Sequence, residues 1–329
     1  MAAGCVRTQA PSPAPTPHVL PSPPVVRSVP RPVPPPQPAP PPSAPSAPSE
    51  EQAWALQIRL DRARFSPGVL DGRWGRKSSL ALAAWEEAHG LPADGDWRGA
   101  PAALTATDGL FVPRTVTAED RAALSPTPAR WADKARAPAL GYNTVCEKIA
   151  EETHTDEAAL RRLNPAADWP DPPAGTVLRV PDVHRVPQKA PAKILVRTAE
   201  RTLRLLDADG KLIAQYPCSI AAKAEKRNVG ETLSVGACAR EPQYTYDPAL
   251  FEDEESRTLT RKLLLPGGPN SPVGIAWIGL SRSGFGIHGS PEPSLIGRTE
   301  SHGCIRLANW DAADLLKVVR TGLPVEIAP

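Results

Sequence analysis

The chain has 329 residues, enough for two or three domains, with 38 basic and 36 acidic side chains and a formal net charge of +2. This balance excludes the strongly positive surface typical of nucleic-acid-binding proteins, so no nucleic acid is expected as a partner. No apolar run approaches the roughly 20 residues that cross a bilayer, so no transmembrane helix is expected.

The first 49 residues are rich in proline and show no apolar periodicity. Eighteen of the 42 prolines lie between Pro11 and Pro48, and proline favours the extended polyproline II conformation. We therefore expect residues 1–49 to form a disordered, semi-rigid linker. PxxP matches would also suit a proline-recognising module, although any proline-rich tract contains them by chance.

Cys5 follows the small residues Ala3 and Gly4 at the start of this linker. The order resembles the end of a bacterial lipoprotein signal, in which the cysteine receives the lipid. The resemblance implies an exported protein of the periplasm or cell envelope that touches the membrane only through a lipid anchor at Cys5. An ordinary N-terminus with a chance cysteine is the alternative.

Residues 50–110 are expected to form a small all-α bundle. Apolar side chains recur at helical spacing on either side of two turn signals, Pro67-Gly68 and Asp71-Gly72. A further Asp-Gly pair, Asp94-Gly95, follows the second helix. The order of helix, DGxxG corner, helix and LPADG resembles the peptidoglycan-binding domain that accompanies many cell-wall enzymes. A helical bundle with coincidental turns is the alternative.

Residues 111–140, which contain several prolines, are expected to connect this bundle to a small module over residues 141–183. The order of apolar runs in the module, and its closing GTVLRVP, resemble LysM, a β-α-α-β carbohydrate binder. The resemblance implies a first strand near residues 141–143, a last strand over residues 176–180, and glycan strands as a partner.

Between those strands the sequence predicts two short helices. Asp156 suits the N-cap of the second helix, and Asn164-Pro165 ends it because the residue before a proline avoids the helical region. His154, at the junction of the two helices, is expected to be a solvated helix-end residue rather than a ligand.

Residues 192–329 are expected to fold as a β-rich, sandwich-like domain. Short apolar runs of strand length are separated by glycines and by Asp209-Gly210, a hairpin signal. One helix is expected, starting at Asp311 and ending at Gly322. The segment is long enough to bury a core of its own.

The five cysteines do not suit a disulfide framework. With Cys5 assigned to lipid and Cys304 to chemistry, Cys146, Cys218 and Cys238 remain. Cys218 and Cys238 can pair in an oxidising compartment or stay as thiols, and the sequence leaves both alternatives open.

A cysteine and two histidines lie close together in the sequence of the C-terminal domain. His288 ends an apolar run, and SHGCIR follows at residues 301–306. A thiol that transfers acyl groups needs an imidazole to accept its proton and backbone N–H donors for the oxyanion. A substrate that carries carboxylates also calls for a cation. His288 or His302, Gly303, Cys304 and Arg306 meet these needs.

The HG pair, an eleven-residue gap and SHGCIR resemble the catalytic motif of the L,D-transpeptidase family, the YkuD-like domain. The resemblance implies that Cys304 is the nucleophile and His288 the general base. Because Gly289 has no side chain, a backbone carbonyl is expected to orient the imidazole. The turn before Cys304 would lend backbone N–H groups to the oxyanion hole. The expected catalytic residues are His288, Gly289, His302, Gly303 and Cys304.

The same resemblance implies residues that contact the substrate. Arg306 is expected to hold either a substrate carboxylate or the carbonyls of its own loop. The insertion at residues 240–271 carries an acidic cluster and is expected to be either a solvated loop or a lid whose tyrosines contact the stem peptide. The expected substrate-binding residues are Tyr244, Tyr246, Ser301, Arg306 and Asn309.

Members of that family attack the third residue of a peptidoglycan stem peptide, release D-alanine and pass the acyl group to an amine, which forms a 3→3 cross-link. The resemblance implies this activity with no cofactor and no metal. An L,D-carboxypeptidase, an enzyme that attaches proteins to the wall, and a non-catalytic wall-binding lipoprotein are alternatives. For Cys304 itself, a zinc site with both histidines and a structural buried thiol are alternatives. The oligomeric state is not predicted.

Overall fold

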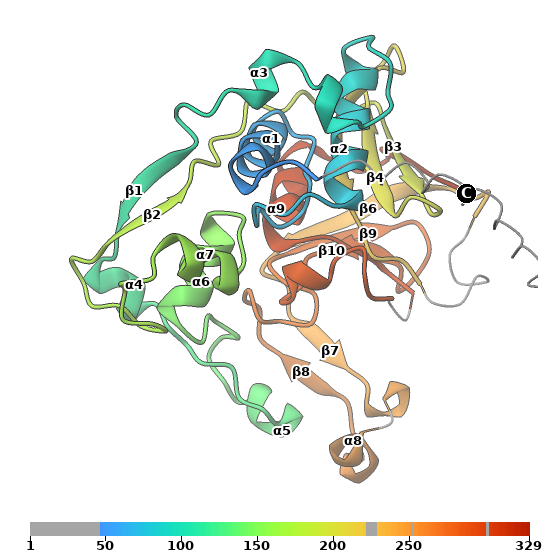
Figure 1. Cartoon of the computed structure of the whole chain (residues 1–329). Coiled ribbons are helices and arrows are strands. Elements are labelled where there is room, and N and C mark those ends of the chain that lie inside the picture. Colours follow the sequence, from blue (N-terminus) through green and yellow to red (C-terminus); the bar gives the residue numbers. More distant parts are fainter. Residues whose placement is uncertain (1–46, 222–228, 252, 301–302) are drawn as a thin grey trace, which may run out of the picture. The chain divides into compact units, whose positions relative to one another are not determined.

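The computed structural model describes residues 47–221, 229–251, 253–300 and 303–329 (Figure 1). Most of the proline-rich linker, with Cys5, lies outside the described residues. The described chain contains a helical unit, a small α/β module and a β-rich domain, in the order predicted from the sequence.

The helical unit is built on α1 (Glu50–Arg62) and α2 (Arg76–Ala88), followed by η1 (Trp97–Gly99) and α3 (Ala102–Thr105). The predicted Asp-Gly corner between α1 and α2 is present. The side-chain oxygen of buried Gln57 accepts the N–H groups of Asp71 and Gly72 at 3.0 and 2.8 Å. Gly72 has φ +67° and lies against Trp54, so only glycine fits there.

The α/β module contains a two-stranded antiparallel sheet of β1 (Phe111–Thr115) and β2 (Val177–Pro181). The expected first strand near residues 141–143 is not formed, and the partner of β2 lies within the segment expected to be a connector. Residues 141–143 instead lead into a helix that Thr144 caps, whereas Phe111 pairs with Pro181 and packs beneath Arg179. The helices between the strands are α4 (Ala118–Ala122), α5 (Trp131–Lys134), α6 (Val145–Glu152) and α7 (Glu157–Leu163).

The β-rich domain has one eight-stranded sheet in the order β11-β10-β9-β6-β12-β3-β4-β5. A bulge between Val235 and Cys238 bends β6, which pairs with β12 before the bulge and mainly with β9 after it. The strands are β3 (Lys193–Arg197), β4 (Thr202–Leu206), β5 (Leu212–Pro217), β6 (Thr232–Arg240), β9 (Ala276–Leu280), β10 (Gly286–His288), β11 (Ile305–Arg306) and β12 (Pro324–Ala328).

The two ends of this sheet meet. Ser219, just after β5, exchanges two backbone hydrogen bonds of 2.9 Å with Arg306 of β11. The predicted β-rich domain is therefore present as one curled sheet, and the sandwich-like part of the prediction is corrected. The bulge in β6 and this closing bridge bring the two halves of the sheet face to face.

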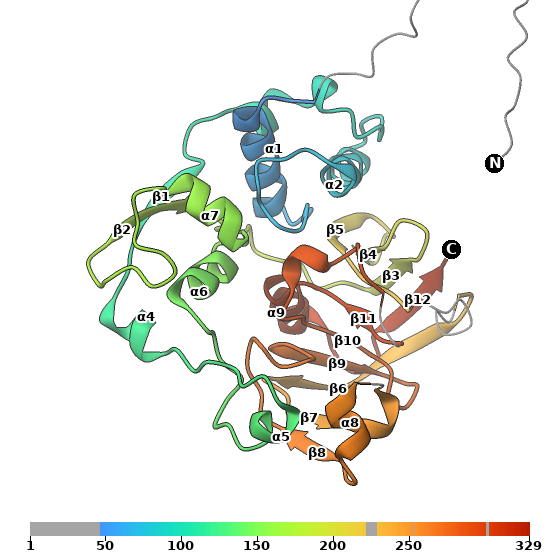
Figure 2. The ribbon, with the colours of Figure 1, turned by 60° about the horizontal axis from the view of Figure 1, so that its bottom comes forward.

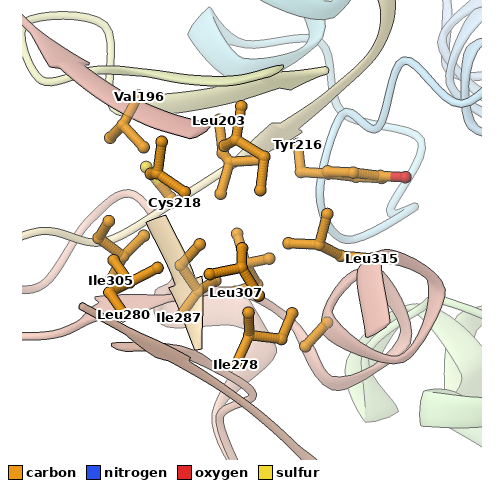
Figure 3. Close-up of a cluster of buried hydrophobic side chains, with 14 of the residues drawn as sticks. Val196, Leu203, Tyr216, Cys218, Ile278, Leu280, Ile287, Ile305, Leu307 and Leu315 are labelled. Atoms are coloured by element: carbon orange, nitrogen blue, oxygen red, sulfur yellow. The ribbon is translucent and has the colours of Figure 1, made fainter. Parts of the chain in front are cut away.

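The core of the domain fills the space between the two halves (Figure 3). Val196 and Leu203 on one half face Ile278 and Ile287 on the other. Helix α9 (Asn309–Val318) adds Leu315 to this cluster. The predicted helix is thus confirmed, although it begins two residues earlier and ends four residues earlier than expected.

The described part of the insertion at residues 240–271 contains a hairpin, which lies beside α5 in Figure 2, and its apolar side chains pack with those of residues 131–140. Trp131 of α5 stacks on Tyr246 with ring centroids 4.2 Å apart, and the Glu255 carboxylate accepts the N–H group of Trp131 at 2.9 Å. The expectation of a solvated loop is therefore wrong. The insertion consists of β7 (Tyr244–Tyr246), η3 (Pro248–Leu250), α8 (Glu254–Thr258) and β8 (Leu263–Leu265).

Candidate active site

The register of β10 and β11 sets the chain segments of the candidate nucleophile and base side by side. The strands are parallel, with Ile287 opposite Ile305 and His288 opposite Arg306. Ile287 and Ile305 enter the core (Figure 3). Because side chains alternate along a strand, His288 and Arg306 take the other face. Cys304 directly precedes β11, and its side chain packs partly against the core cluster that contains Ile287 and Ile305.

The imidazole of His288 is buried and fixed at one nitrogen. Its Nδ1 lies 2.7 Å from the carbonyl oxygen of Gly289, the backbone contact expected from the sequence. Trp277, opposite His288 on β9, stacks on the ring with centroids 5.7 Å apart. Because Nδ1 carries the proton that it donates to this carbonyl, Nε2 is the nitrogen that can accept another proton. Burial, opposed by the hydrogen bond to Gly289 and aided by the charge of Arg306, lowers the pKa of His288 to about 4, so the ring is neutral at pH 7.

The thiol of Cys304 is half-buried beside backbone groups of β10. Its Sγ lies 3.5 Å from the carbonyl oxygen of Gly284, and the N–H of Gly286 also bonds to the sulfur. Burial raises the pKa of the Cys304 thiol, while the backbone N–H bonds oppose that shift. Cys304 and His288 therefore rest as a neutral thiol and a neutral imidazole, which calls for proton transfer during the attack.

Arg306 contacts its own loop. Its Nη2 donates to the carbonyl oxygen of Glu300 at 2.7 Å and to the hydroxyl of Thr299 at 3.0 Å. Of the two expected roles, the structure supplies contacts for holding the loop. The next residues, Ser301 and His302, lie outside the described residues. Their expected contacts with substrate stay predictions.

Asn309 was expected to bind substrate, but its position contradicts this. The side chain is fully buried at the start of α9. Its Oδ1 accepts the N–H groups of Ile275 and Ser290, and its Nδ2 donates to Glu151 and to the carbonyl oxygen of Pro269. Protein groups occupy the whole amide, so Asn309 orders the backbone around the site.

The two tyrosines of the insertion have different surroundings. Tyr246 is fully buried and bonds through its hydroxyl to Ser256, so it cannot contact substrate and that expectation is corrected. Tyr244 is half-buried. Burial raises the pKa of Tyr244, and a negative charge on Cys304 would raise it further, which places this phenol near the sulfur.

Sequence reasoning missed an ionic cluster behind the site. The Arg185 guanidinium is buried and bonds to the carboxylates of Asp61, Asp311 and Asp314 at 2.5, 2.7 and 2.7 Å. His154 is not solvated as expected, because it is buried with Nδ1 2.9 Å from Asp61 and its ring stacks on Trp310. Its partners lie far away in the sequence, so no local pattern could have revealed them.

Within the part of the chain that the structure describes, no group of three or more histidine, cysteine or acidic side chains is arranged to hold a metal ion. Among the same residues, no helix is long and apolar enough to cross a membrane. Cys146, Cys218 and Cys238 form no disulfide, and burial raises the pKa of the Cys218 thiol to about 12.

A half-buried thiol next to a strand that carries a buried, neutral imidazole, with a backbone N–H group at the sulfur, is typical of a cysteine acyltransferase. Comparison with known proteins gives the family. Residues 191–327 match the L,D-transpeptidase catalytic domain, YkuD, and residues 49–97 match a family described as "Putative peptidoglycan binding domain". The chain is 32% identical over 183 residues, 56% of its length, to "Putative L,D-transpeptidase YkuD" of Bacillus licheniformis, of which it covers 93%. The chain belongs to the L,D-transpeptidase family, and both resemblances are confirmed.

Other relatives are more distant. "Probable L,D-transpeptidase YbiS" of Escherichia coli is 26% identical over 186 residues, which are 56% of this chain and 60% of that protein. The crystal structure of L,D-transpeptidase 3 from Mycobacterium tuberculosis with a faropenem-derived adduct aligns at 18% identity and a TM-score of 0.33, over 52% of this chain and 84% of that one. Both family matches concern peptidoglycan, which makes the wall the partner of this chain and places its action outside the cytoplasm.

Proposed function

We propose that this protein forms 3→3 cross-links between peptidoglycan stem peptides through an acyl-enzyme on Cys304. The observation that carries the proposal is the parallel pairing of β10 and β11, which sets the segment that ends in Cys304 beside the strand of His288, with a backbone N–H donor at the sulfur. Membership of the L,D-transpeptidase family supplies the reaction class. Because Cys304 and His288 are both neutral at rest, the thiol proton must move to the imidazole during the attack.

In the first half-reaction the donor stem acylates the sulfur. The proton of Cys304 moves to Nε2 of His288 as the sulfur bonds to the carbonyl carbon of the third stem residue. The bond from that carbon to the nitrogen of the terminal D-alanine breaks, and the imidazolium returns the proton to the leaving amine. The carbonyl of Gly289 keeps Nδ1 protonated, so Nε2 faces the reaction throughout.

In the second half-reaction an amine from another stem attacks the thioester. His288 accepts the proton that the amine loses, the C–S bond breaks, and the sulfur takes the proton back. Backbone N–H groups of Gly303 and Cys304 would stabilise the oxyanion in both steps. Tyr244 borders the path of the donor stem in this proposal.

The decisive experiment follows the acyl group. Purified stem tetrapeptide is incubated with the wild type and with Cys304→Ala, and products are read by mass spectrometry. We expect a covalent adduct on Cys304, release of D-alanine and a cross-linked dimer with the wild type only. Cys238→Ala is the matched control because Cys238 is exposed on β6, and this variant should behave like the wild type.

The same experiment separates the alternatives. D-alanine release with no dimer, even with excess acceptor amine, would make the protein an L,D-carboxypeptidase. An adduct that only a protein lysine can resolve would indicate attachment of proteins to the wall. If neither an adduct nor D-alanine is formed, the enzyme proposal is wrong and a wall-binding role is left.

We also propose that the α/β module at residues 111–183 is LysM-like and binds glycan. Its support is the β1–β2 pair with α6 and α7 between the strands. The full chain should sediment with glycan strands from which an amidase has removed the stem peptides. Sedimentation with whole wall but not with peptide-free strands would contradict glycan binding.

Lipidation of Cys5 is the last part of the proposal. Its support is the sequence order of small residues before the cysteine and the proline-rich sequence after it. Cells that express the chain and are fed radioactive palmitate should label the wild type but not Cys5→Ser. Equal labelling of both would exclude a lipid at this position.

A further inference from the structure

Asn309 connects the α/β module to the loop that follows the candidate base. On one side its Nδ2 donates to the Glu151 carboxylate of α6 at 2.9 Å, across 158 positions of sequence. On the other side its Oδ1 accepts the N–H of Ser290 at 3.1 Å. Ser290 follows Gly289, whose carbonyl oxygen fixes Nδ1 of His288. A continuous chain of contacts thus runs from α6 to the imidazole.

Glu151 determines which way the Asn309 amide points. A carboxylate can only accept, as can the Pro269 carbonyl oxygen 3.1 Å from Nδ2, so the NH₂ group must face them. The amide oxygen is then turned toward the N–H groups of Ser290 and Ile275. A flipped amide would face acceptors with its oxygen and donors with its NH₂ group, at the cost of all four contacts.

The loop has little room to adopt another position. A Cβ on Gly289 would lie 2.2 Å from Oδ1 of Asn309, and one on Gly274 would lie 2.0 Å from it. The backbone therefore lies directly on the amide oxygen. A small rotation of Asn309 must move Gly289, and with it the carbonyl oxygen that holds His288.

Glu151 itself is held by the module. The Tyr142 hydroxyl donates to its Oε1 at 2.8 Å, so the two carboxylate oxygens have one partner in the module and one in the catalytic domain. The neighbouring Glu152 differs, because its carboxylate bonds to Arg114 and Lys148 within the module.

We propose that Glu151 is a positioning residue for the catalytic base, and that the α/β module thereby completes the active site. The module would then be part of the catalytic unit as well as a candidate wall binder. The proposal uses the roles of Cys304 and His288 given under the proposed function. It assigns no contact between Glu151 and substrate.

The test uses the full chain and a readout that needs no substrate. Alkylation of Cys304 by iodoacetamide is followed by peptide mass spectrometry, alongside kcat and KM for the stem tetrapeptide. Glu151→Ala should slow alkylation by about tenfold or more and lower kcat with little change in KM, because displaced catalytic groups can cost about 100-fold. Glu152→Ala, the matched control on the same helix, should alkylate at the wild-type rate.

Glu151→Gln tests whether the hydrogen bonds are what matters. Glutamine can accept from Asn309 with its oxygen and present its NH₂ group to the Tyr142 hydroxyl, which accepts in turn. Burial raises the pKa of Glu151 to about 7, so an uncharged side chain is a close substitute. Glu151→Gln should therefore keep alkylation near the wild-type rate. A loss as large as in Glu151→Ala would overturn the hydrogen-bond argument.

A pair of substitutions that exchanges the amide and the carboxylate keeps the proposal testable if Glu151→Ala does not fold. Asn309→Asp sets a carboxylate against that of Glu151 and should slow alkylation, whereas Asn309→Asp with Glu151→Gln restores one donor between them and should recover part of the rate. Equal slowing in the single and double variants would overturn the proposal, as would wild-type alkylation in a folded Glu151→Ala. Alkylation that responds as expected without transpeptidase activity would contradict only the proposed function.

Discussion

Arg306 lies opposite His288 in the register of β10 and β11, and its guanidinium bonds to Thr299 and to the carbonyl oxygen of Glu300. Arg306, the strand partner of His288, thus holds the loop that leads to Cys304. Its charge also faces the imidazole and lowers the pKa of His288, after the larger effect of burial. The arginine of the SHGCIR motif is therefore placed to hold the loop that leads to Cys304.

Replacing Arg306 with methionine should lower kcat by about 10- to 100-fold, because the loop before Cys304 loses both hydrogen bonds and small displacements of reacting groups are costly. KM should change little. Steady-state kinetics with the stem tetrapeptide measures both constants. Arg298→Met is the matched control, since Arg298 is an exposed arginine of the same loop. A rise in KM with unchanged kcat would instead indicate that Arg306 binds a substrate carboxylate.

The pH dependence of Cys304 alkylation should report the state of His288. Burial lowers the pKa of His288 to about 4, so the ring can accept the thiol proton at all pH values above that. As pH falls through about 4 the ring becomes charged and the rate should fall. Rates measured from about pH 3 to about pH 8 should therefore show an acid limb well below 6.5, the ordinary value for histidine.

His288→Asn provides the control for that profile. Without an imidazole the rate should follow the thiolate alone and rise about tenfold per pH unit, up to the raised pKa of Cys304. A wild-type limb centred near 6.5 would mean that the imidazole is exposed to water, contrary to its burial.

The motif residues of this site, which lie close together in the sequence, could be predicted, but most of their distant partners could not. SHGCIR and the upstream HG pair lie within a short segment of chain, and the pairing of β10 with β11 sets these two motifs side by side. Asn309 is equally close in sequence, but its role depends on Glu151, which is 158 positions away. His154 likewise depends on Asp61, 93 positions away. Side-chain type and spacing contain no information about such partners.

The same distinction holds for the fold. Helices α1, α2 and α9 follow apolar periodicity and were predicted, as was the Asp71-Gly72 corner. The partner strand of β2 was misplaced because pairing is a long-range property, and Phe111 lies far from Val177 in the chain. Curling of the sheet could not be predicted either, because it depends on a bulge in β6 and on the bridge between Ser219 and Arg306.

Gly289→Ala should destabilise the fold and impair the site. The added methyl group would lie 2.2 Å from Oδ1 of Asn309 and 3.3 Å from Cα of Gly274, both in the packed interior. Overpacking of this kind costs about 1–3 kcal/mol of unfolding free energy. Urea denaturation measures that loss, and Cys304 alkylation should slow in parallel. Gly99→Ala is the control, since its Cβ would meet open space, and an unchanged Gly289→Ala would contradict the close approach.

Arg185→Met should cost about 3–5 kcal/mol of unfolding free energy, because it leaves the buried Asp311 carboxylate without its counter-charge. Burial tends to raise the pKa of Asp61, but the charges of Arg185 and His154 keep it below its ordinary range, whereas burial dominates at Asp311 and raises its pKa. The loss should therefore shrink in mild acid, where Asp311 is protonated first. Urea denaturation at pH 7 and pH 5 checks this sign.

The matched control for the ionic cluster is Arg98→Met. Arg98 pairs with Asp96 on the surface of the helical unit, where such a pair contributes about 0–1 kcal/mol. Adding Asp311→Asn to Arg185→Met should recover part of the lost stability, since one unpaired charge is removed from the interior. Because Arg185 joins Asp61 of the helical unit to Asp311 and Asp314 of α9, its loss should also make the two parts unfold in separate steps. A single transition of unchanged midpoint would show that the cluster does not couple them.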